Sequence, residues 1–120
     1  MRARLFAIAI AFVLTAPVSV VVQTPAPQRP IVVQGAMPSE TDTLVARLSR
    51  ATIERVGGWT FWRGDVDGYP VIVSRTLKGT ANAGAATAIA AVRFHPIAIV
   101  NQGTAGGHDP ALHLYDIVLG

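Results

Sequence analysis

The feature that most limits the fold is Ile97–Val100, a short run in which every residue is apolar. Pro96 precedes it and a glycine-rich stretch, Asn101–Gly107, follows it. Strands of parallel sheets read as continuous apolar runs, because helices cover both faces of such sheets. The run therefore predicts a strand buried on both faces, in an α/β sheet with at least one parallel crossover.

A second β-branched run, Ile31–Val33, predicts another strand near the beginning of the folded part. It ends at Gln34-Gly35, and Pro38 then occupies the position of a first helical residue, where its missing N–H costs nothing. The order is therefore strand, tight turn and helix.

The helix that begins at Pro38 is predicted to continue until Gly57-Gly58 stops it. Leu44, Val45 and Leu48 fall on one of its faces, which is typical of a surface helix packed on a sheet.

Two β-rich runs, Trp59–Val66 and Tyr69–Arg75, flank the dipeptide Asp67-Gly68. Asp-Gly readily adopts the positive φ angles that a two-residue hairpin turn requires. This segment predicts a β-hairpin.

An alanine-rich stretch, Gly79–Phe94, predicts a second helix, which Pro96 terminates. We expect its small apolar stripe to pack closely on the sheet; the stripe consists of Ala85, Ala88, Ile89 and Val92.

A further strand is predicted to begin at Ile117–Leu119, just before the last residue, Gly120. Only two helices are predicted after the N-terminal leader, so one face of the apolar strand would be poorly covered. We expect either a fragment of a larger reading frame or cover borrowed from a partner subunit.

The N-terminus has the pattern of a secretory signal. Arg2 and Arg4 precede an apolar stretch, Leu5–Val22, and a proline-rich exit follows. Cleavage after Ala26 would divide the chain into a signal peptide, residues 1–26, and a domain, residues 27–120, exported to the periplasm and free of the membrane. A retained membrane anchor is the alternative, against which Pro17 argues.

Composition excludes several classes of protein. The 120 residues allow one domain at most. Loss of Arg2 and Arg4 lowers the formal net charge from +3 to about +1, and the remaining basic residues are scattered, which disfavours nucleic-acid binding. The absence of cysteine excludes disulfides, Cys-ligated zinc and thiol nucleophiles.

Two features at strand ends are candidates for chemistry. The backbone N–H groups of the loop Gly103–Gly107 could approach an anion or ribose oxygens, or the loop could be a plain crossover turn. It lacks the dinucleotide and phosphate-loop glycine spacings. Glu40 follows the other strand and can face the same crevice, as a general base on water or as a carboxylate that favours the helix dipole.

Other constellations are weaker. His108, Asp109 and His113 do not have the spacing of a compact metal-ligand set, so we expect surface or capping histidines and no metal site. Arg63-Gly64-Asp65 resembles an adhesion tripeptide but falls within a predicted strand. No Gly-x-Ser-x-Gly elbow occurs, which excludes that type of serine hydrolase.

Four ordered motifs together resemble the methylthioadenosine/S-adenosylhomocysteine nucleosidases of the nucleoside phosphorylase superfamily, from Ile31 to Gly120. The motifs are Ile31–Met37 with Glu40, Val73–Thr76 with Gly79, Asn101–Gly107, and Asp116–Leu119 with Gly120. The resemblance implies the N-terminal half of a three-layer α/β/α sandwich with a mixed central sheet. It also implies a purine nucleoside substrate, cleavage of the N-glycosidic bond, no cofactor, and a homodimer for the full-length protein.

The resemblance also implies roles for individual residues. Glu40 matches the glutamate that activates the attacking water, and Met37 matches a methionine that lies against the ribose. Thr104 matches a serine or threonine at the nucleophile site, with Gly103 and Gly35 as further substrate-binding positions. The family's purine-protonating aspartate and its ribose-binding glutamate come from motifs C-terminal to Gly120.

Charge favours hydrolysis over phosphorolysis. Related phosphorylases carry an arginine where this chain has Asn101, and Glu40 would repel phosphate. Lys78 replaces a small apolar residue of the hydrolases, so an anion site near Gly79 stays an alternative. His108 departs from the commonest hydrolases, so the residues do not fix the exact substrate. The alternatives are a phosphorylase, an inactive nucleoside-binding remnant, and a small membrane-anchored structural domain.

The leader pattern gives the first testable prediction. N-terminal sequencing of the exported protein is expected to find a mature start at Pro27, because the small residues Ala26 and Thr24 occupy the −1 and −3 positions of that cleavage site. An intact Met1 on membrane-bound protein would instead support the retained anchor.

Overall fold

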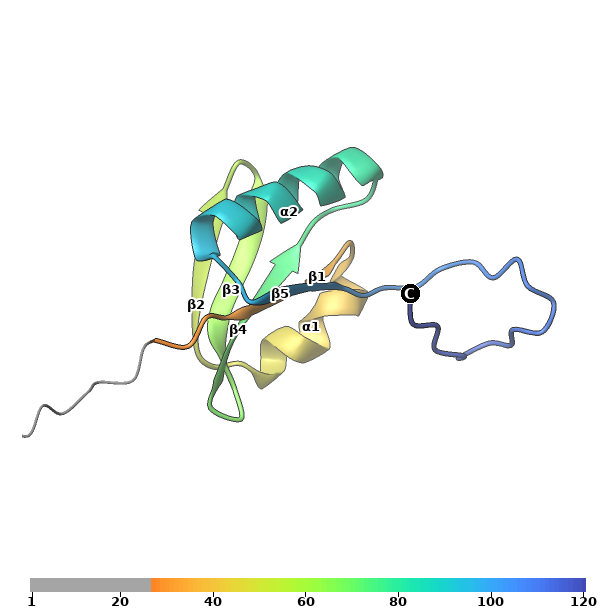
Figure 1. The fold of residues 1–120 in the computed structure, drawn as a ribbon, viewed down its shortest axis with the longest axis horizontal. Coiled ribbons are helices and arrows are strands. Elements are labelled where there is room, and N and C mark those ends of the chain that lie inside the picture. The colour runs from red at the N-terminus through yellow and green to blue at the C-terminus, as the bar shows by residue number, and fades with distance from the viewer. Residues whose placement is uncertain (1–26) are drawn as a thin grey trace, which may run out of the picture.

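The computed structural model describes residues 27–120, so the predicted signal peptide lies outside the described residues. In this range a five-stranded sheet lies between two helices (Figure 1). In chain order the elements are β1 (Ile31–Gly35), α1 (Pro38–Arg47), β2 (Ser49–Val56), β3 (Trp59–Val66), β4 (Tyr69–Arg75), α2 (Thr80–Phe94) and β5 (Ala98–Asn101).

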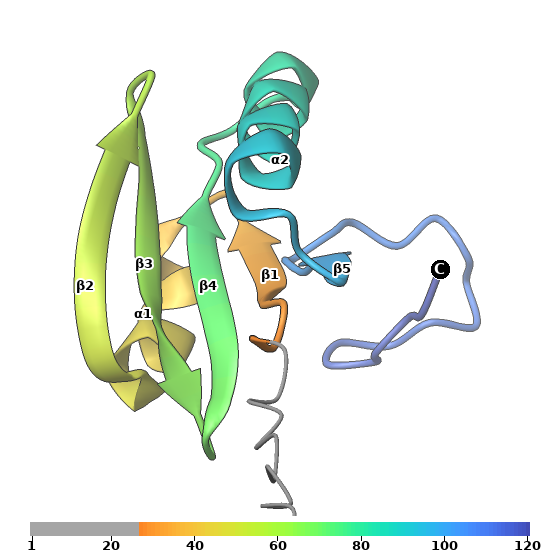
Figure 2. The ribbon, with the colours of Figure 1, turned by 60° about the vertical axis from the view of Figure 1, so that its left-hand side comes forward.

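The sheet has the order β2-β3-β4-β1-β5 (Figure 2). β1 is parallel to both of its neighbours, so Val32 is paired with Ile72 of β4 on one side and with Ile99 of β5 on the other. β2, β3 and β4 form an antiparallel meander. The sheet is therefore mixed, as predicted, and β1 is its parallel centre.

The two helices cover opposite faces of the sheet (Figure 1), and each covers its own apolar cluster. Under α2 the buried residues are Val32, Phe61, Ile72, Ala90 and Phe94. Under α1 they are Leu48, Val71 and Val73, with Leu44 and Val45 packed against them. This arrangement confirms the three-layer α/β/α architecture.

The predicted hairpin is confirmed with its turn. Asp67 and Gly68 join β3 to β4 with φ angles of +50° and +83°. Both angles are in the left-handed region that a two-residue turn demands.

The first helix is shorter than predicted: it begins at Pro38 as expected but ends at Arg47, and Ser49–Val56 forms β2 instead. Gly57 and Gly58, read as a helix stop, have φ angles of +59° and +92° and form the turn that returns the chain into β3. Pairing with β3 along most of β2 outweighs the local helical spacing, as tertiary context commonly does.

The second helix has the predicted extent but a different buried face. Ala86, Ala90 and Phe94 face the sheet, whereas Val92, part of the predicted stripe, is 74% exposed. Alanines occur on more than one face of α2, so the sequence pattern did not distinguish which alanine face is buried. Phe94 decides the rotation, because its ring packs edge-on against Phe61 with centroids 5.2 Å apart.

Two predictions for the C-terminal part were wrong in detail. β5 forms, but it is not buried on both faces: Val100 is 49% exposed and Ile97, just before the strand, is 63% exposed. Among the described residues β5 pairs only with β1 and is therefore an edge strand of the sheet. Ile117–Leu119 has no strand structure, so that predicted strand is not formed.

Gly64, the centre of the adhesion-like tripeptide, lies inside β3 and has a structural explanation. The chain that leaves α1 crosses β3 there, and a Cβ at position 64 would lie 2.6 Å from the Ser49 carbonyl oxygen and 3.0 Å from the Leu48 Cβ. The β2–β3 register shifts between Ser49 and Thr52, at this same crossing. Only glycine allows such a close approach of backbone to backbone.

Gly64→Ala is expected to lower the free energy of unfolding by about 1–3 kcal/mol, because the methyl group overpacks against backbone atoms that cannot yield. Urea unfolding measures the change. Gly84→Ala is the control: a Cβ at position 84 in α2 meets nothing within 4 Å, so that variant is expected to gain about 0.5–1 kcal/mol of stability. A Gly64→Ala protein as stable as wild type would contradict the crossing argument.

Candidate functional site

The carboxyl ends of the parallel strands β1, β4 and β5 meet at one edge of the sheet (Figure 1). Backbone bonds continue past the strand ends there: the Thr76 N–H donates to the Gly35 carbonyl at 2.9 Å, and the Gln102 N–H donates to the Gln34 carbonyl at 2.9 Å. Open α/β sheets place their ligands at this edge.

Glu40 is the third residue of α1 and lies at this edge. Its Oε2 accepts hydrogen bonds from the Ala36 N–H at 2.7 Å and the Met37 N–H at 3.1 Å. The first N–H groups of a helix and of the turn before it have no intrahelical acceptor. The carboxylate therefore stabilises the β1–α1 turn, as well as favouring the helix dipole.

The other carboxylate oxygen reaches the loop after β5. Oε1 of Glu40 accepts from the Thr104 backbone N–H at 3.0 Å and from the Thr104 Oγ1 hydroxyl at 3.1 Å. The prediction that Glu40 and the glycine-rich loop face the same crevice is confirmed. Gln102 adds a second link, because its side-chain amide donates to the Glu40 backbone carbonyl.

The close approach of the loop backbone to the Glu40 carboxylate requires glycine at position 103. A Cβ at position 103 would lie 2.9 Å from Oε1 of Glu40, where real Cβ atoms are essentially never found. At Gly35 an added Cβ would meet the Glu40 Cβ at 3.0 Å and Thr41 Cγ2 at 3.1 Å. Both glycines let backbone approach the carboxylate, which is a physical reason for their place in the motifs.

The same hydrogen bonds set the charge of Glu40. The Thr104 backbone N–H, helped by the Ala36 and Met37 N–H groups and the Thr104 hydroxyl, holds the pKa of Glu40 below its ordinary value of 4.5, against an opposing effect of desolvation. Donors directed at a carboxylate favour its ionised form. Glu40 is therefore an anion at neutral pH.

A cavity of about 320 Å³ opens in front of this carboxylate. Glu40, Gly103 and Thr104 line it, whereas Met37 and Gly35 do not: Gly35 is the last residue of β1 and Met37 is the N-cap of α1.

Asn101, the last residue of β5, also lines the cavity, and from the sequence it served only to argue against phosphate binding. No individual role was assigned to the lining residues that follow β4 or β5 or lie at the start of α2; these are Thr76, Leu77, Gly79, Thr80, Ala83 and Gln102. Their common signal is position, directly after a parallel strand or at the start of the helix that follows one.

Of the histidines near the C-terminus, His113 lies beside Asp116. His113 and Asp116 lie 3.8 Å apart, and Asp116 also accepts the His113 N–H at 2.7 Å. Within residues 27–120 no group of three or more His, Asp or Glu side chains converges on a point. In that same range no helix has the length and apolar character needed to cross a membrane.

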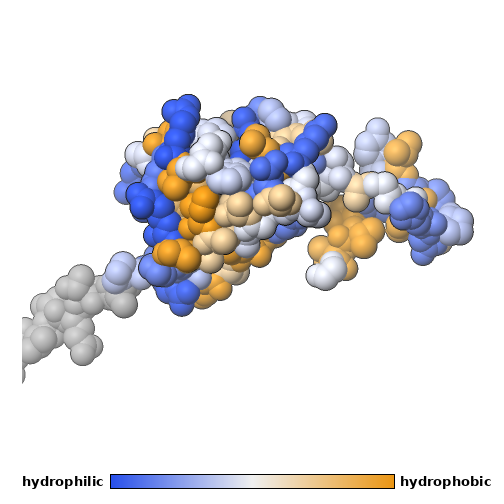
Figure 3. Space-filling view, turned by 90° about the horizontal axis from the view of Figure 1, so that it is seen from above, coloured by the Kyte–Doolittle hydropathy of each residue, from blue (hydrophilic) through white to orange (hydrophobic). Residues whose placement is uncertain are grey.

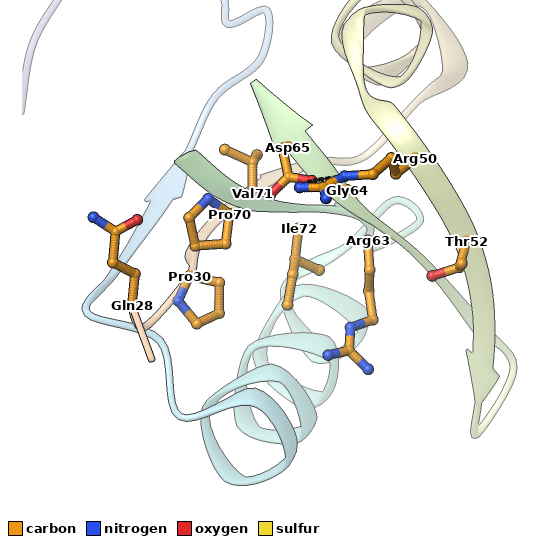
Figure 4. A pocket seen from close by; sticks show the side chains of 10 residues that line it. All are labelled: Gln28, Pro30, Arg50, Thr52, Arg63, Gly64, Asp65, Pro70, Val71 and Ile72. Atoms are coloured by element: carbon orange, nitrogen blue, oxygen red, sulfur yellow. Dashed lines mark hydrogen bonds and ion pairs between the residues drawn. The ribbon is translucent and has the colours of Figure 1, made fainter. Parts of the chain in front are cut away.

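A second cavity, of about 380 Å³, lies on the α2 side of the sheet, beside the end of that helix (Figure 4). Its charged side chains pair with carboxylates: Arg50 donates to Asp65 at 3.1 Å and 2.7 Å, and Arg63 lies 3.6 Å from Glu54. Both pairs link β2 to β3, so these arginine side chains are engaged in ion pairs within the sheet.

Comparison with known proteins identifies the family to which this fold and cavity belong. Residues 30–120 match the family model of the Phosphorylase superfamily. The chain belongs to this superfamily. Its predicted relationship to the methylthioadenosine/S-adenosylhomocysteine nucleosidases is confirmed by the relatives and by the solved structures.

Two curated relatives are nucleosidases of this name. The 5'-methylthioadenosine/S-adenosylhomocysteine nucleosidase of Psychromonas ingrahamii is 35% identical over 85 residues, which are 71% of this chain and 37% of the relative. That of Bacillus cytotoxicus is 38% identical over 89 residues, 74% of this chain and 38% of the relative. The chain therefore spans little more than a third of the length of these relatives.

A solved structure gives the same picture of the fold. The nucleosidase of Colwellia psychrerythraea, in complex with adenine, superposes with a TM-score of 0.69 at 34% sequence identity. The match covers 72% of this chain and 36% of that one. The mixed sheet with its two helices therefore corresponds to about a third of the chain of that nucleosidase.

Glu40→Gln is expected to destabilise the protein at neutral pH and much less in acid. Since the folded state lowers the pKa of Glu40, its stabilisation is fully present above about pH 4.5 and is lost as the pH falls through the lowered pKa. The measurement is the urea midpoint of wild type and variant at about pH 7 and about pH 3. Asp67→Asn, at an exposed turn carboxylate, is the control, and a Glu40→Gln difference that does not shrink in acid would contradict the argument.

Proposed function

We propose that this chain provides the water-activating half of a purine nucleosidase site, which hydrolyses the N-glycosidic bond of methylthioadenosine- or S-adenosylhomocysteine-type nucleosides. The observation that carries the proposal is the Glu40 carboxylate, held as an anion beside the glycine-rich loop and open to a cavity. The names of the relatives support the substrate class.

In the proposed reaction a water oxygen bonds to C1′ of the ribose as the bond from C1′ to the purine nitrogen breaks. Glu40 accepts one proton of the water, and an acid on the opposite side of the sugar donates a proton to the departing purine. The products are the free sugar and the neutral base. A carboxylate with a lowered pKa is a weak base toward free water, but water becomes strongly acidic as its oxygen bonds to C1′, so the transfer occurs late.

The hydrogen bonds of Glu40 indicate where the water enters. A carboxylate has about four acceptor positions, and Ala36, Met37 and the two donors of Thr104 fill them in this structure. Three of these donors are backbone N–H groups with fixed directions, whereas the Thr104 hydroxyl can rotate. We infer that the water replaces this hydroxyl on Oε1 and that Thr104 then helps to hold the water.

Hydrolysis is the favoured reaction rather than phosphorolysis. The cavity lining contains no arginine or lysine among the described residues, and its charged group is the Glu40 carboxylate. A phosphate dianion there would meet repulsion without a counter-charge.

Two wider proposals rest on the sequence. The leader, residues 1–26, supports export to the periplasm. The acid for the purine and the ribose-binding glutamate are proposed to come from a C-terminal part of the fold, since the chain matches only 37% of the Psychromonas ingrahamii relative.

The test joins residues 27–120 to the C-terminal part of that relative, in place of the segment that this chain matches. The fusion is expected to release adenine from methylthioadenosine, and the unmodified 120-residue chain is not, because general acid assistance worth about 10²–10⁴ in rate is missing from it. Glu40→Gln in the fusion is expected to lower kcat by about 10²-fold or more with little change in nucleoside affinity.

Ser39→Ala, at an exposed position in the same helical turn, is the matched control and should leave kcat unchanged. A Glu40→Gln fusion with near-normal kcat would overturn the role of Glu40. Adenine release by the 120-residue chain alone would overturn the need for a second part. A fusion that binds methylthioadenosine without cleaving it would favour the inactive-remnant alternative.

A further inference from the structure

The side chain of Arg75, the last residue of β4, is held against the start of α1. Its Nε and Nη2 atoms both donate to the Oγ1 hydroxyl of Thr41, at 3.1 Å and 2.9 Å. On the sheet side the guanidinium lies over the ring of Trp62, with Cζ 4.7 Å from the ring centroid. A planar guanidinium that is both stacked and hydrogen-bonded has a fixed position.

Thr41 transmits this contact to the turn that carries Glu40. Its side chain is fully buried, and its hydroxyl donates to the Met37 carbonyl at 3.1 Å. The same carbonyl accepts the Glu40 N–H at 3.1 Å, and the Met37 N–H donates to Oε2 of Glu40 at 3.1 Å. A chain of hydrogen bonds therefore joins Arg75 to the Glu40 carboxylate through the β1–α1 turn.

The chemistry of a hydroxyl gives this chain its direction. A hydroxyl has a single proton to donate. The two N–H groups of Arg75 occupy the acceptor side of Thr41, so the threonine proton is directed to the Met37 carbonyl. A lysine at position 75 would keep the charge but would have no planar fork to make both contacts while stacked on the ring.

We propose that Arg75 is a positioning residue for Glu40, because through Thr41 it fixes the start of α1 and with it the carboxylate that faces the cavity. This rests on the proposed function, in which that carboxylate accepts a proton from water. Arg75 does not itself line the cavity. Its effect on the reaction is geometric: a displacement of about 1 Å in a reacting group can lower the rate on the order of 10²-fold.

The ion pair between Arg75 and Asp42 is a separate contact of the same guanidinium. The Asp42 side chain is 64% exposed, and exposed ion pairs contribute little to stability. Asp42→Asn therefore removes one partner of Arg75 and leaves the chain of hydrogen bonds to Glu40 intact.

These contacts can be tested in the 120-residue chain itself. They lie among α1, β3 and β4, in the body of the molecule from which the C-terminal segment stands away (Figure 3). The first measurement is the pKa of the Glu40 carboxyl, followed by carbon-detected NMR as the pH is changed.

Thr41→Val removes the hydroxyl without changing the charge of the protein. It is expected to raise the pKa of Glu40 toward 4.5, because the N–H groups of the β1–α1 turn lose their fixed direction. Thr41→Ser keeps the hydroxyl and is expected to restore the wild-type pKa. Arg75→Met is expected to raise the pKa of Glu40 as well, and Arg75→Lys to give a value between that of Arg75→Met and that of wild type.

Arg63→Met is the matched control on the opposite face of the sheet. Arg63 also stacks on an aromatic ring, with Cζ 5.4 Å from the Phe94 centroid, and is directed toward α2 (Figure 4). It also pairs with a carboxylate, that of Glu54, at 3.6 Å. Arg63→Met is expected to leave the pKa of Glu40 unchanged, and Asp42→Asn is expected not to raise it.

The second measurement uses the fusion of residues 27–120 with the C-terminal part of the Psychromonas ingrahamii relative. Thr41→Val and Arg75→Met are expected to lower its kcat about tenfold with little change in KM, since nucleoside contacts are kept and only the direction of the base is lost. Arg63→Met is expected to keep the wild-type kcat, and circular dichroism checks that every variant is folded.

A Glu40 pKa that stays at its wild-type value in Thr41→Val would overturn the proposal, because Arg75 would then act through its charge alone. An equal rise in Thr41→Val and Thr41→Ser would also overturn it, because packing and not the hydroxyl would be the cause. A fusion that releases no adenine while the pKa of Glu40 rises as expected supports positioning and counts against the proposed function. An active fusion whose kcat is unchanged by Thr41→Val supports the function and overturns the positioning role.

Discussion

The parallel pairing of β1 with both β4 and β5 is the constraint on which the rest of this structure depends. It directs three carboxyl ends to one edge, so the turn after Gly35, the loop after Arg75 and the loop after Asn101 become neighbours. The two helices follow from it, because parallel connections must cross over the faces of the sheet. Residues more than 60 positions apart, Glu40 and Thr104, thereby come within hydrogen-bond distance.

The Glu40 carboxylate links the β1–α1 turn to the loop after β5 and also faces the cavity. One oxygen holds the start of α1, and the other holds the loop after β5. The donors that hold the carboxylate also keep it ionised, and the resulting negative charge disfavours phosphate in the same cavity. The same four hydrogen bonds stabilise the fold and set the charge of the carboxylate to which we assign the proposed catalytic role, so stability and activity need separate measurements.

The exposed surface follows the same topology. The meander of β2, β3 and β4 ends in a charged edge, and its charges are engaged in pairs such as Arg50 with Asp65. The parallel half ends in an apolar edge at β5. Ile97 and Val100 at this edge are more than 40% exposed, so apolar character there does not coincide with burial among the described residues.

The sequence by itself determined the features that depend on local chemistry: the Asp67-Gly68 turn, the start of α1 at Pro38, and the motif series that identified the family and placed Glu40 beside the glycine loop. Tertiary structure alone decided that Ser49–Val56 is a strand and that Gly57-Gly58 is a hairpin turn, because pairing with β3 overrides helical spacing. It also chose the buried face of α2, through one ring contact of Phe94. Local sequence specifies turns and caps, whereas cross-strand pairing and burial require partners that lie far away in the chain.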